Sequence, residues 1–435
     1  MRRKAYRIVY EVMEQQKHSD VIFHTMLESD PSLEGKDKRF IKRLSYGTIE
    51  RVVELDAYIR HFSKLTVRQL TPSVRTVLRM AVYELLYMDK IPQAVSCHEA
   101  VELLKGVEGE RYAGYVNGVL RAFLRNEENL RLRPYEALCL PKNLYQYLIE
   151  KYGKKTTKKI AQAFLERQGE ITLHIDTNKI SCEQYEENLK KHEIDYQKGN
   201  YVKEALIVRN IEDVKRLPGY DEGYFFVQDE SSMLPSLCAG ICPGQTVVDV
   251  CAAPGGKTMS ALIQLRGEGI LSYRDVNVKK VSRIRENLER FGYKNVEGKV
   301  WDGTKEDPDW REKADVVLAD VPCSGIGIIG KKPEIRYHAM QETESLVPIQ
   351  QKICESSAAM LRKGGVFIYS TCTINEKENE QNVAWIEEHC GMKCESLDPF
   401  IPEILQNRMT AEGSLQILPG IHQSDGFFVA RLKKQ

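Results

Sequence analysis

Two cysteines have the placement of groups that could act on one substrate. Cys323 and Cys372 each follow an apolar segment, residues 314–319 and 365–369, of the kind that forms a buried strand. Neighbouring strands of a doubly wound sheet end at the same edge, so both thiols should open into one crevice beside Asp320. Buried cysteines at strand ends are usually core residues. The alternative is nucleophilic chemistry, for which a thiolate is better suited than a hydroxyl at neutral pH, and the adjacent acid favours it.

A second chemical feature is the octapeptide Cys-Ala-Ala-Pro-Gly-Gly-Lys-Thr at residues 251–258. It joins a β-branched run to a helical pattern, which predicts a strand, a tight turn and a helix. Such a turn exposes bare backbone at the carboxyl end of a strand, where open α/β sheets bind ligands, although an ordinary connection is the alternative. Cys251 stands where a phosphate-binding P-loop has Gly, and no Gly-x-Gly-x-x-Gly spacing occurs here. Nucleoside triphosphate and dinucleotide sites are therefore disfavoured.

The segments between this turn and the cysteines alternate between strand and helix patterns, which predicts an α/β sheet. One strand ends at Arg274-Asp275, where an acidic residue is placed to accept the ribose hydroxyls of a nucleoside cofactor. Arg274 could pair with Asp275 and weaken that role. The next strand ends at Asp302, which could bond an adenine amino group or cap the turn before Gly303.

These motifs resemble those of the RNA cytosine-5 methyltransferases. Residues 251–258 match the cofactor loop of that family without a change, and Pro322-Cys323 and Thr371-Cys372 match its two cysteine motifs. The resemblance implies that Cys372 adds to C6 of a cytosine, that Cys323 assists release, and that Asp320 holds the N3/N4 edge of the base. It implies S-adenosylmethionine as cofactor, bound by Cys251, Ala252, Ala253, Pro254, Gly255, Gly256, Lys257, Asp275, Asp302 and Asp320. The target cytosine must leave its stack to reach Cys372.

The N-terminal part predicts a helical bundle. Apolar residues recur at intervals of three and four in residues 5–12, 40–49 and 74–86, and Thr71-Pro72-Ser73 is a helix-start signal. Phrases at residues 37–48, 78–87, 91–101 and 115–121 resemble the NusB-type RNA-binding domain of the bacterial 16S rRNA cytosine-5 methyltransferase family called RsmB, Sun or Fmu. That resemblance implies RNA binding through basic side chains, with Arg2, Arg3, Lys4, Arg121 and Arg125 as candidates.

The middle of the chain predicts connecting structure. Residues 131–159, basic and interleaved with Tyr, favour a linker helix near RNA. Strand, helix and strand patterns between 171 and 208 predict a small α+β adaptor, in which His174 and Asp176 stand where the family has an Arg-x-Asn pair. Asp229 then begins a helix N-cap pattern. Farther on, the basic residues 331–334 follow a glycine-rich loop and predict a mobile lid that contacts phosphates.

Charge is divided unevenly along the 435 residues. Residues 1–167 hold 30 Lys and Arg against 21 Asp and Glu, a net charge of +9, and the remainder is at −8. Basic charge concentrated in one part suits a polyanion such as RNA, although a solvated helical surface explains a surplus of this size nearly as well. No apolar run is long enough to span a bilayer. The 11 cysteines favour free thiols over disulfides or a metal site, as in a cytoplasmic protein.

We therefore expect a multidomain protein with three parts. These are an all-α NusB-like RNA-binding domain at 1–130, a linker helix and small α+β adaptor at 131–225, and an α/β Rossmann-like class I methyltransferase domain at 226–435. The expected function is methylation of C5 of a cytosine in 16S ribosomal RNA through a covalent cysteine–C6 adduct. We expect a monomer that acts on this RNA in the cytoplasm and does not bind a membrane. The alternative is a non-catalytic RNA-binding ribosome-assembly factor that retains the fold, which the presence of Cys372 and the glycines disfavours.

Overall fold

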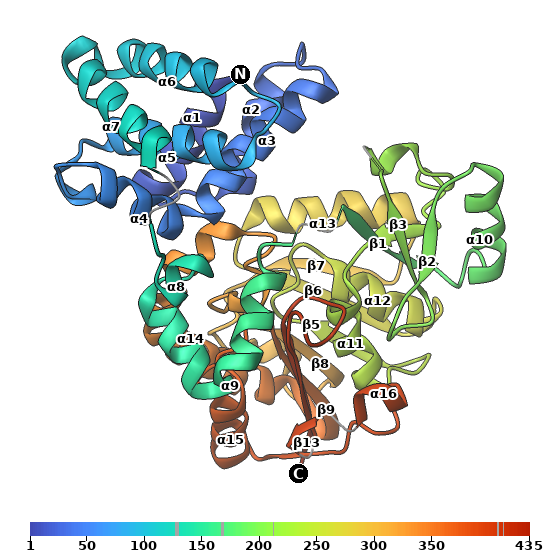
Figure 1. Cartoon of the computed structure of the whole chain (residues 1–435). Helices are drawn as coiled ribbons and strands as arrows, with labels where there is room; N and C mark the ends of the chain where they lie inside the picture. The colour runs from blue at the N-terminus through green and yellow to red at the C-terminus, as the bar shows by residue number, and fades with distance from the viewer. Residues whose placement is uncertain (127–129, 167–168, 212, 407–408, 412) are drawn as a thin grey trace. The chain divides into compact units, whose positions relative to one another are not determined.

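The computed structural model describes residues 1–126, 130–166, 169–211, 213–406, 409–411 and 413–435 (Figure 1). Contacts divide the chain into two units: residues 1–166 with 329–338, and residues 167–328 with 339–435. The boundaries expected after residues 130 and 225 stay predictions. None of the helices in the described ranges combines the length and apolar character needed to cross a membrane.

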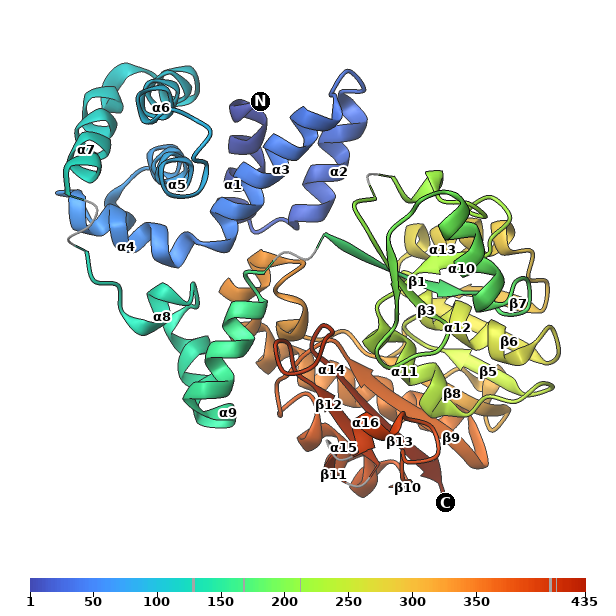
Figure 2. The same ribbon diagram turned by 45° about the vertical axis from the view of Figure 1, so that its right-hand side comes forward.

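The first unit is helical, as predicted. Its core helix α5 contacts α1, α3, α4, α6 and α7, which surround it in Figure 2. The start signal at Thr71 is confirmed, because its hydroxyl accepts a hydrogen bond from the N–H of Val74 and Pro72 occupies the first turn. The elements are α1 (Arg2–Gln15), α2 (Ser19–Ser29), α3 (Gly35–Glu50), α4 (Val52–Phe62), η1 (Val67–Gln69), α5 (Pro72–Tyr87), α6 (Gln93–Glu108), η2 (Glu110–Tyr112), α7 (Ala113–Asn126), α8 (Pro134–Ala137), α9 (Lys142–Ala163) and η7 (Pro333–Tyr337).

The short segment 329–338, from the second half of the sequence, completes this helical unit. Glu334 is buried and accepts hydrogen bonds from the N–H and the hydroxyl of Ser19 at 3.0 and 2.8 Å. Arg336, also buried, donates to the carbonyl of Glu50 at 2.6 Å. Buried charged groups held by such bonds are costly to expose. The prediction of a mobile basic lid is therefore wrong, because packing anchors the segment.

The second unit begins with a small antiparallel sheet and one long helix packed on it, which confirms the α+β prediction. The strand order is β2-β3-β1-β4. Tyr185 and Leu189 of α10 are buried against Leu173 and Val208 of the sheet. The elements are β1 (Glu170–Ile175), α10 (Cys182–Lys191), β2 (Tyr196–Lys198), β3 (Ala205–Arg209), η4 (Val214–Arg216) and β4 (Phe225–Val227).

The rest of the second unit is an α/β domain built on a mixed sheet, as predicted. The strand order is β11-β12-β13-β9-β8-β5-β6-β7, and β10 pairs with β13. Strands β9, β8, β5, β6 and β7 run parallel. The elements are α11 (Glu230–Ala239), β5 (Thr246–Asp249), α12 (Gly256–Leu265), β6 (Ile270–Asp275), α13 (Val278–Phe291), β7 (Val296–Val300), η5 (Pro308–Trp310), β8 (Ala314–Asp320), η6 (Ile326–Ile328), α14 (Ala339–Met360), β9 (Leu361–Thr371), α15 (Glu380–His389), β10 (Met392–Cys394), α16 (Glu403–Gln406), β11 (Met409–Ala411), β12 (Ser414–Ile417) and β13 (Phe427–Lys434).

Both faces of this sheet are covered by helices. Val247 and Val316 belong to a core shared with α11, α12 and α13, whereas their neighbours Val248 and Val317 belong to a core shared with α14 and α15. Successive side chains of a strand point to opposite faces, so the two helix layers lie on opposite sides. This burial explains the continuous apolar runs in the sequence, and it leaves the carboxyl edge of the sheet for polar groups.

Candidate active site

The two predicted thiols meet beyond the ends of β8 and β9. In this parallel pair Asp320 lies opposite Ser370, and the N–H of Val321 donates to the Ser370 carbonyl at 3.1 Å. Because of this register, the residues that follow the two strands leave the sheet side by side. The Sγ atoms of Cys323 and Cys372 therefore lie 3.2 Å apart. Both side chains are partly buried. The pair therefore lies where the strand pattern predicts it.

The surroundings of Cys323 disfavour its thiolate form. The hydrogen bond with Cys372 and burial raise the pKa of Cys323 well above its ordinary value, and the negative charges of Glu378 and Asp320 act in the same direction. Either sulfur can be the donor of the hydrogen bond between them.

A buried carboxylate that sequence reasoning missed connects the two thiol-bearing loops. Glu378 is fully buried and accepts hydrogen bonds from the N–H of Ser324, which follows Cys323, at 2.8 Å and from the hydroxyl of the same residue. The Ser324 hydroxyl also lies 2.9 Å from that of Thr373, which follows Cys372. Further donors to the carboxylate are the hydroxyl of Thr343 and the amide of Gln350. Burial raises the pKa of Glu378.

Asp320 lies beside the thiols and is held from two sides. The Nζ of Lys257 is 2.6 Å from its Oδ2, and the hydroxyl of Ser370 donates to its Oδ1 at 2.9 Å. The ammonium group also lies over the ring of Phe427, 5.2 Å from the centroid. Lys257 was predicted to bind cofactor, but in this structure its charge is directed to Asp320.

The glycine turn joins β5 to α12 as predicted, and its backbone is closely approached on two sides. Gly255 has a φ of 108°, and a Cβ there would lie 3.3 Å from Ile284. A Cβ on Gly256 would lie 3.1 Å from the amide of Gln228. Because larger residues would displace these neighbours, glycine keeps the turn tight and its backbone bare. Behind the turn, burial raises the pKa of Asp249 to about 7.

The two outer acids stand at the predicted strand ends. Asp275 ends β6 and accepts a hydrogen bond from the N–H of Asn277 at 3.0 Å. Asp302 follows β7 and accepts hydrogen bonds from the hydroxyl and the N–H of Thr304 at 2.7 and 3.1 Å. These bonds, the hydroxyl first, lower the pKa of Asp302. The capping alternative for Asp302 is therefore observed, and its second carboxylate oxygen has only Lys305, at 3.6 Å, as an ion-pair partner among the described residues.

Arg274 does not neutralise Asp275. Its side chain is fully buried and pairs with Asp307 at 2.9 Å, with its guanidinium 5.0 Å from the ring centroid of Trp310. Lys299 binds the same carboxylate at 2.6 Å. The concern that Arg274 weakens the ribose site is thus removed, because alternating residues of β6 point to opposite faces.

The edge of the sheet fits a nucleoside cofactor. Val276 and Val278, directly beyond Asp275, are 69% and 61% exposed, unusual for Val next to a buried strand. Sequence reasoning missed them, although two Val residues on either side of Asn277, directly after the predicted ribose acid Asp275, were a visible signal. Together with the bare turn they offer apolar contact to a base and backbone to the rest of the ligand. Over the described residues, His, Cys, Asp and Glu side chains form no cluster suited to a metal ion.

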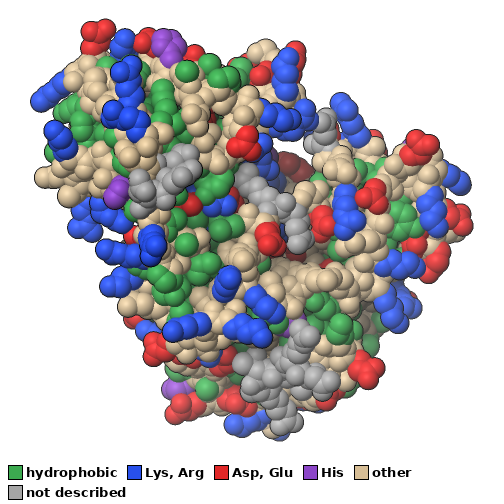
Figure 3. Space-filling view, in the orientation of Figure 1, with side chains coloured by type: hydrophobic (Ala, Val, Ile, Leu, Met, Phe, Trp, Pro, Cys, Tyr) green, Lys and Arg blue, Asp and Glu red, His purple; other side chains and the backbone are tan. Residues whose placement is uncertain are grey.

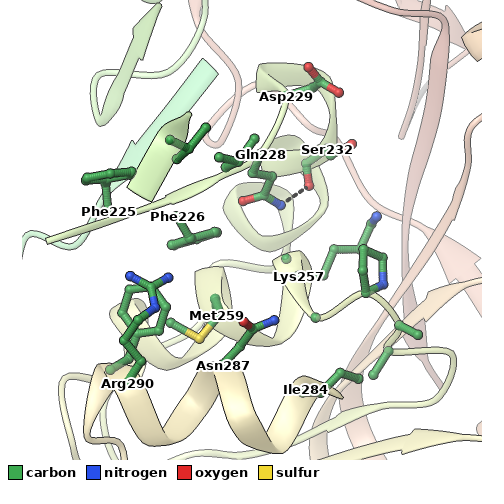
Figure 4. Close-up of a pocket in the computed structure, with 18 of the residues that line it drawn as sticks. Phe225, Phe226, Gln228, Asp229, Ser232, Lys257, Met259, Ile284, Asn287 and Arg290 are labelled. Carbon is green, nitrogen blue, oxygen red and sulfur yellow. Dashed lines mark hydrogen bonds between the residues drawn. The ribbon is translucent and has the colours of Figure 1, made fainter. Parts of the chain in front are cut away.

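A cavity of about 570 Å³ begins at Lys257 and Asp320 and extends away from the strand edge. Figure 4 shows Phe225 and Phe226 on one side of it and Asn287 and Arg290 on α13 on the other. Gln228 and Asp229 also line it. Asp229 stands at the N-cap position of α11 as predicted, but its side chain makes no capping hydrogen bond.

Some of the predicted RNA contacts are occupied within the protein. Arg2 pairs with Glu84 at 2.8 Å and Lys4 with Asp30 at 2.9 Å, so both have structural partners. Arg3, Arg121 and Arg125 are exposed side chains of α1 and α7. On the face in Figure 3, Lys and Arg side chains are spread over the helical unit with acidic ones among them. In the adaptor, His174 is buried against Phe226 and does not reach the surface.

Three family models match the chain in consecutive parts. The NusB family matches residues 1–125, an RsmF/B-like ferredoxin-like domain matches 140–215, and a model described as 16S rRNA methyltransferase RsmB/F matches 240–433. The chain is 28% identical over its whole length to a probable ribosomal RNA small subunit methyltransferase B from Synechocystis sp., of which the match covers 99%. It is 29% identical to the protein of the same name from Bacillus subtilis, with 99% of this chain and 98% of that one covered.

Solved structures show the same architecture. The crystal structure of PH0851 matches with a TM-score of 0.81 and 26% identity, covering 99% of both chains. The structure of NSun6 from Pyrococcus horikoshii with SFG matches 68% of this chain and 98% of its own with a TM-score of 0.61 and 24% identity. The first match extends over both units, and the second shows a shared fold for about two thirds of the chain.

Proposed function

The chain belongs to the RsmB/F family of 16S rRNA methyltransferases, with an N-terminal NusB domain, and on that premise we propose that it methylates C5 of a cytosine in small-subunit rRNA. The observation that carries this proposal is the pair of thiols 3.2 Å apart beside Asp320. A factor that only bound RNA would need no nucleophile at a strand edge. C5 of cytosine is a poor nucleophile by itself, and thiolate addition to C6 is what activates it.

The methyl donor in this proposal is S-adenosylmethionine, which when bound supplies an electrophilic methyl group. Asp275 would accept the ribose hydroxyls, and Asp302 would bond the adenine amino group through its less occupied oxygen. Val276 and Val278 would contact the faces of the adenine. The remaining cofactor contacts come from the backbone of residues 251–256, where glycine leaves room for close approach.

The geometry supports the following roles for the reacting groups. The thiolate of Cys372 adds to C6, forming a C–S bond, and the electron pair moves to C5, which then takes the methyl group. Asp320, oriented by Lys257 and Ser370, holds the N3/N4 edge of the base and favours its protonated form. Once Cys372 is bonded to C6, a thiolate at Cys323 accepts the C5 proton. The C–S bond then breaks with its electron pair returning to the Cys372 sulfur, which restores aromatic 5-methylcytosine and free Cys372. Cys323 lies within contact of that sulfur and assists this release.

The assignment of Cys372 rather than Cys323 as nucleophile rests on family membership. We also propose that residues 1–130 and 131–225 act as RNA-binding domain and adaptor ahead of a catalytic domain at 226–435. The exposed Arg3, Arg121 and Arg125 support RNA binding by the first of these, since they leave charge available for phosphates.

The test is methyl transfer from labelled S-adenosylmethionine to unmodified small-subunit rRNA, followed by nucleoside analysis. Wild type, Cys372→Ser, Cys323→Ser and the exposed control Cys242→Ser are compared. We expect 5-methylcytidine from the wild type and the control, none from Cys372→Ser, and a covalent protein–RNA complex that accumulates with Cys323→Ser. Cofactor binding without methyl transfer to any rRNA would instead support the alternative, a non-catalytic assembly factor.

A further inference from the structure

The cavity of about 570 Å³ adjoins the proposed cofactor site and extends beyond it. Its lining includes the turn residues 252–257 and Asp320 but neither Asp275 nor Asp302. It is bounded by β4 and the η4 segment of the adaptor on one side and by α12 and α13 on the other (Figure 4). The glycine turn therefore separates two spaces: the strand edge, with its ribose acid, and this cavity. The two spaces share the turn residues 252–257 and Asp320 as a common wall.

The interior of the cavity offers flat apolar contact. Phe226 and Phe291 pack edge to face with their ring centroids 5.8 Å apart, and Met259 and Ile284 contribute aliphatic surface. In Figure 4 the amide of Asn287 projects from α13 toward the cavity. Aromatic surface beside an amide is the combination with which proteins hold an unstacked nucleobase, by contact with its face and hydrogen bonds to its edge.

The cavity also carries cations, alongside the acidic Asp213 and Asp229. Arg290 and Lys215 line it, and in the part of the chain that the structure describes neither has a carboxylate within 4.0 Å. The guanidinium of Arg290 is held 4.3 Å from the ring centroid of Tyr220 and 4.2 Å from that of Phe291, and it donates to the Tyr220 carbonyl. A cation fixed in this way, with its charge unpaired, suits a phosphate.

We propose that this cavity binds the RNA nucleotide adjacent to the target cytosine. The proposal rests on the proposed function, since it places the neighbour relative to a base held at Asp320. When the target leaves its stack, the adjacent base loses a stacking partner and needs a new one. The cavity starts at the residues that hold the target, is large enough for one nucleotide, and combines apolar walls with unpaired cations. Sequence preference next to the target is thus read by the adaptor and α13 together.

The test uses two cavity variants and one matched control. Asn287→Ala and Arg290→Gln alter the cavity, whereas Arg285→Gln removes an exposed charge from the same helix without touching the lining. The substrate is an unmodified single-stranded fragment of small-subunit rRNA that contains the target cytosine. The fragment is used either intact or with an abasic site directly before or after this cytosine. Binding of S-adenosylhomocysteine reports that each variant has folded.

We expect the KM for intact RNA to rise roughly tenfold in each cavity variant, the loss typical of one base contact, with kcat and cofactor affinity little changed. Arg285→Gln should match the wild type. An abasic site on one side of the target cytosine should raise the wild-type KM by a similar factor. The same abasic site should raise the KM of Asn287→Ala by a smaller factor. Cavity variants that behave like Arg285→Gln, or indifference of the wild type to both abasic sites, would overturn the proposal.

A second measurement separates this proposal from the proposed function. RNA fragments carrying 4-thiouridine are cross-linked to the full-length wild type, and the attached peptides are identified. Cross-links within residues 213–229 or 284–291 support the cavity as a nucleotide site even if no methyl transfer is found, in which case only the proposed chemistry fails. Cross-links found exclusively elsewhere overturn the cavity assignment whatever the methyl-transfer result.

Discussion

The ammonium group of Lys257 lies 2.6 Å from one carboxylate oxygen of Asp320, while the hydroxyl of Ser370 donates to the other. Lys257 belongs to the turn of the glycine motif and Asp320 to the strand that leads to Cys323. The contact therefore ties the loop expected to hold the methyl donor to the acid expected to hold the base. In the proposed function, a substrate base approaches Asp320 with this ion pair already in place.

Replacement of Lys257 should show whether it serves the acid or the cofactor. We expect Lys257→Met to lower kcat by roughly 10²-fold, because Asp320 loses the charge that orients it, with cofactor affinity little changed. Lys257→Arg keeps the charge and should retain more activity. Single-turnover methyl transfer and titration with S-adenosylhomocysteine measure the two effects. A large loss of cofactor affinity at unchanged kcat would show that Lys257 contacts the cofactor instead.

The buried Glu378 should behave as a positioning residue. In Glu378→Gln the amide can donate to the hydroxyls of Ser324 and Thr343, while its oxygen still accepts from the Ser324 N–H, so we expect a change in unfolding free energy below about 1 kcal/mol. Glu378→Ala leaves several buried donors unpaired and should cost about 3 kcal/mol. Chemical denaturation measures both.

Activity provides a second readout at the same position. Glu378→Ala should lower kcat more than it raises the KM for RNA, because the loops that carry the two thiols lose their common anchor. Glu378→Gln should restore most of kcat. Equal activity of the two variants would mean that the network around Glu378 does not position the thiols.

The buried pair of Arg274 and Asp307 should respond unequally to truncation. Arg274→Met leaves Asp307 paired with Lys299 and should cost about 1 kcal/mol or less. Asp307→Ala leaves the Arg274 guanidinium buried with no carboxylate within 4.0 Å in the described chain, and should cost about 3 kcal/mol. Unfolding of the two single variants and the double variant tests this. Equal costs in unfolding free energy would show that Lys299 does not stabilise the Asp307 carboxylate when Arg274 is replaced.

His174 should make the second unit less stable in mild acid. Burial lowers its pKa from 6.5 to about 4. Between these values the unfolded chain takes up a proton that the folded chain excludes, so stability falls as the pH drops from about 6.5 toward 4. The contribution lost at pH 5 is about 2 kcal/mol.

His174→Phe removes this titration and keeps a ring against Phe226, while Gln228 still accepts a hydrogen bond from Ser260 at 2.8 Å. We therefore expect the variant to lose less stability than the wild type between pH 7 and pH 5. Hydrogen exchange of peptides from β1 and β4, followed in denaturant at both pH values, measures the difference. If the stability of the two proteins depended identically on pH, the acid destabilisation could not be assigned to His174.

Much of the site was predictable because it depends on local pattern and on one rule of topology. Residues 251–258 encode their own turn, and parallel strands carry Cys323 and Cys372 to the same edge whatever surrounds them. The same reasoning placed Asp275 and Asp302 at strand ends. The partner of Arg274 was not predictable, since Asp307 approaches from a separate loop and no periodicity marks it.

What the sequence could not reveal was long-range burial of polar residues. Glu378 sits in a charged run, residues 375–380, that reads as a solvated loop, yet it is fully enclosed. Residues 331–334 read as a basic lid for the same reason, and Glu334 is instead buried against Ser19. In both cases the deciding partners lie far away along the chain or on another element, where composition gives no signal.

The membership of residues 329–338 in the helical unit bears on how the protein is made. A ribosome releases the N-terminal helices first, but the segment with Glu334 and Arg336 emerges only after much of the methyltransferase domain. Until then the N-terminal bundle lacks part of its final surface, and the groups around Ser19 and Glu50 stay open to water. The unit that is synthesised first is therefore among the last to be completed.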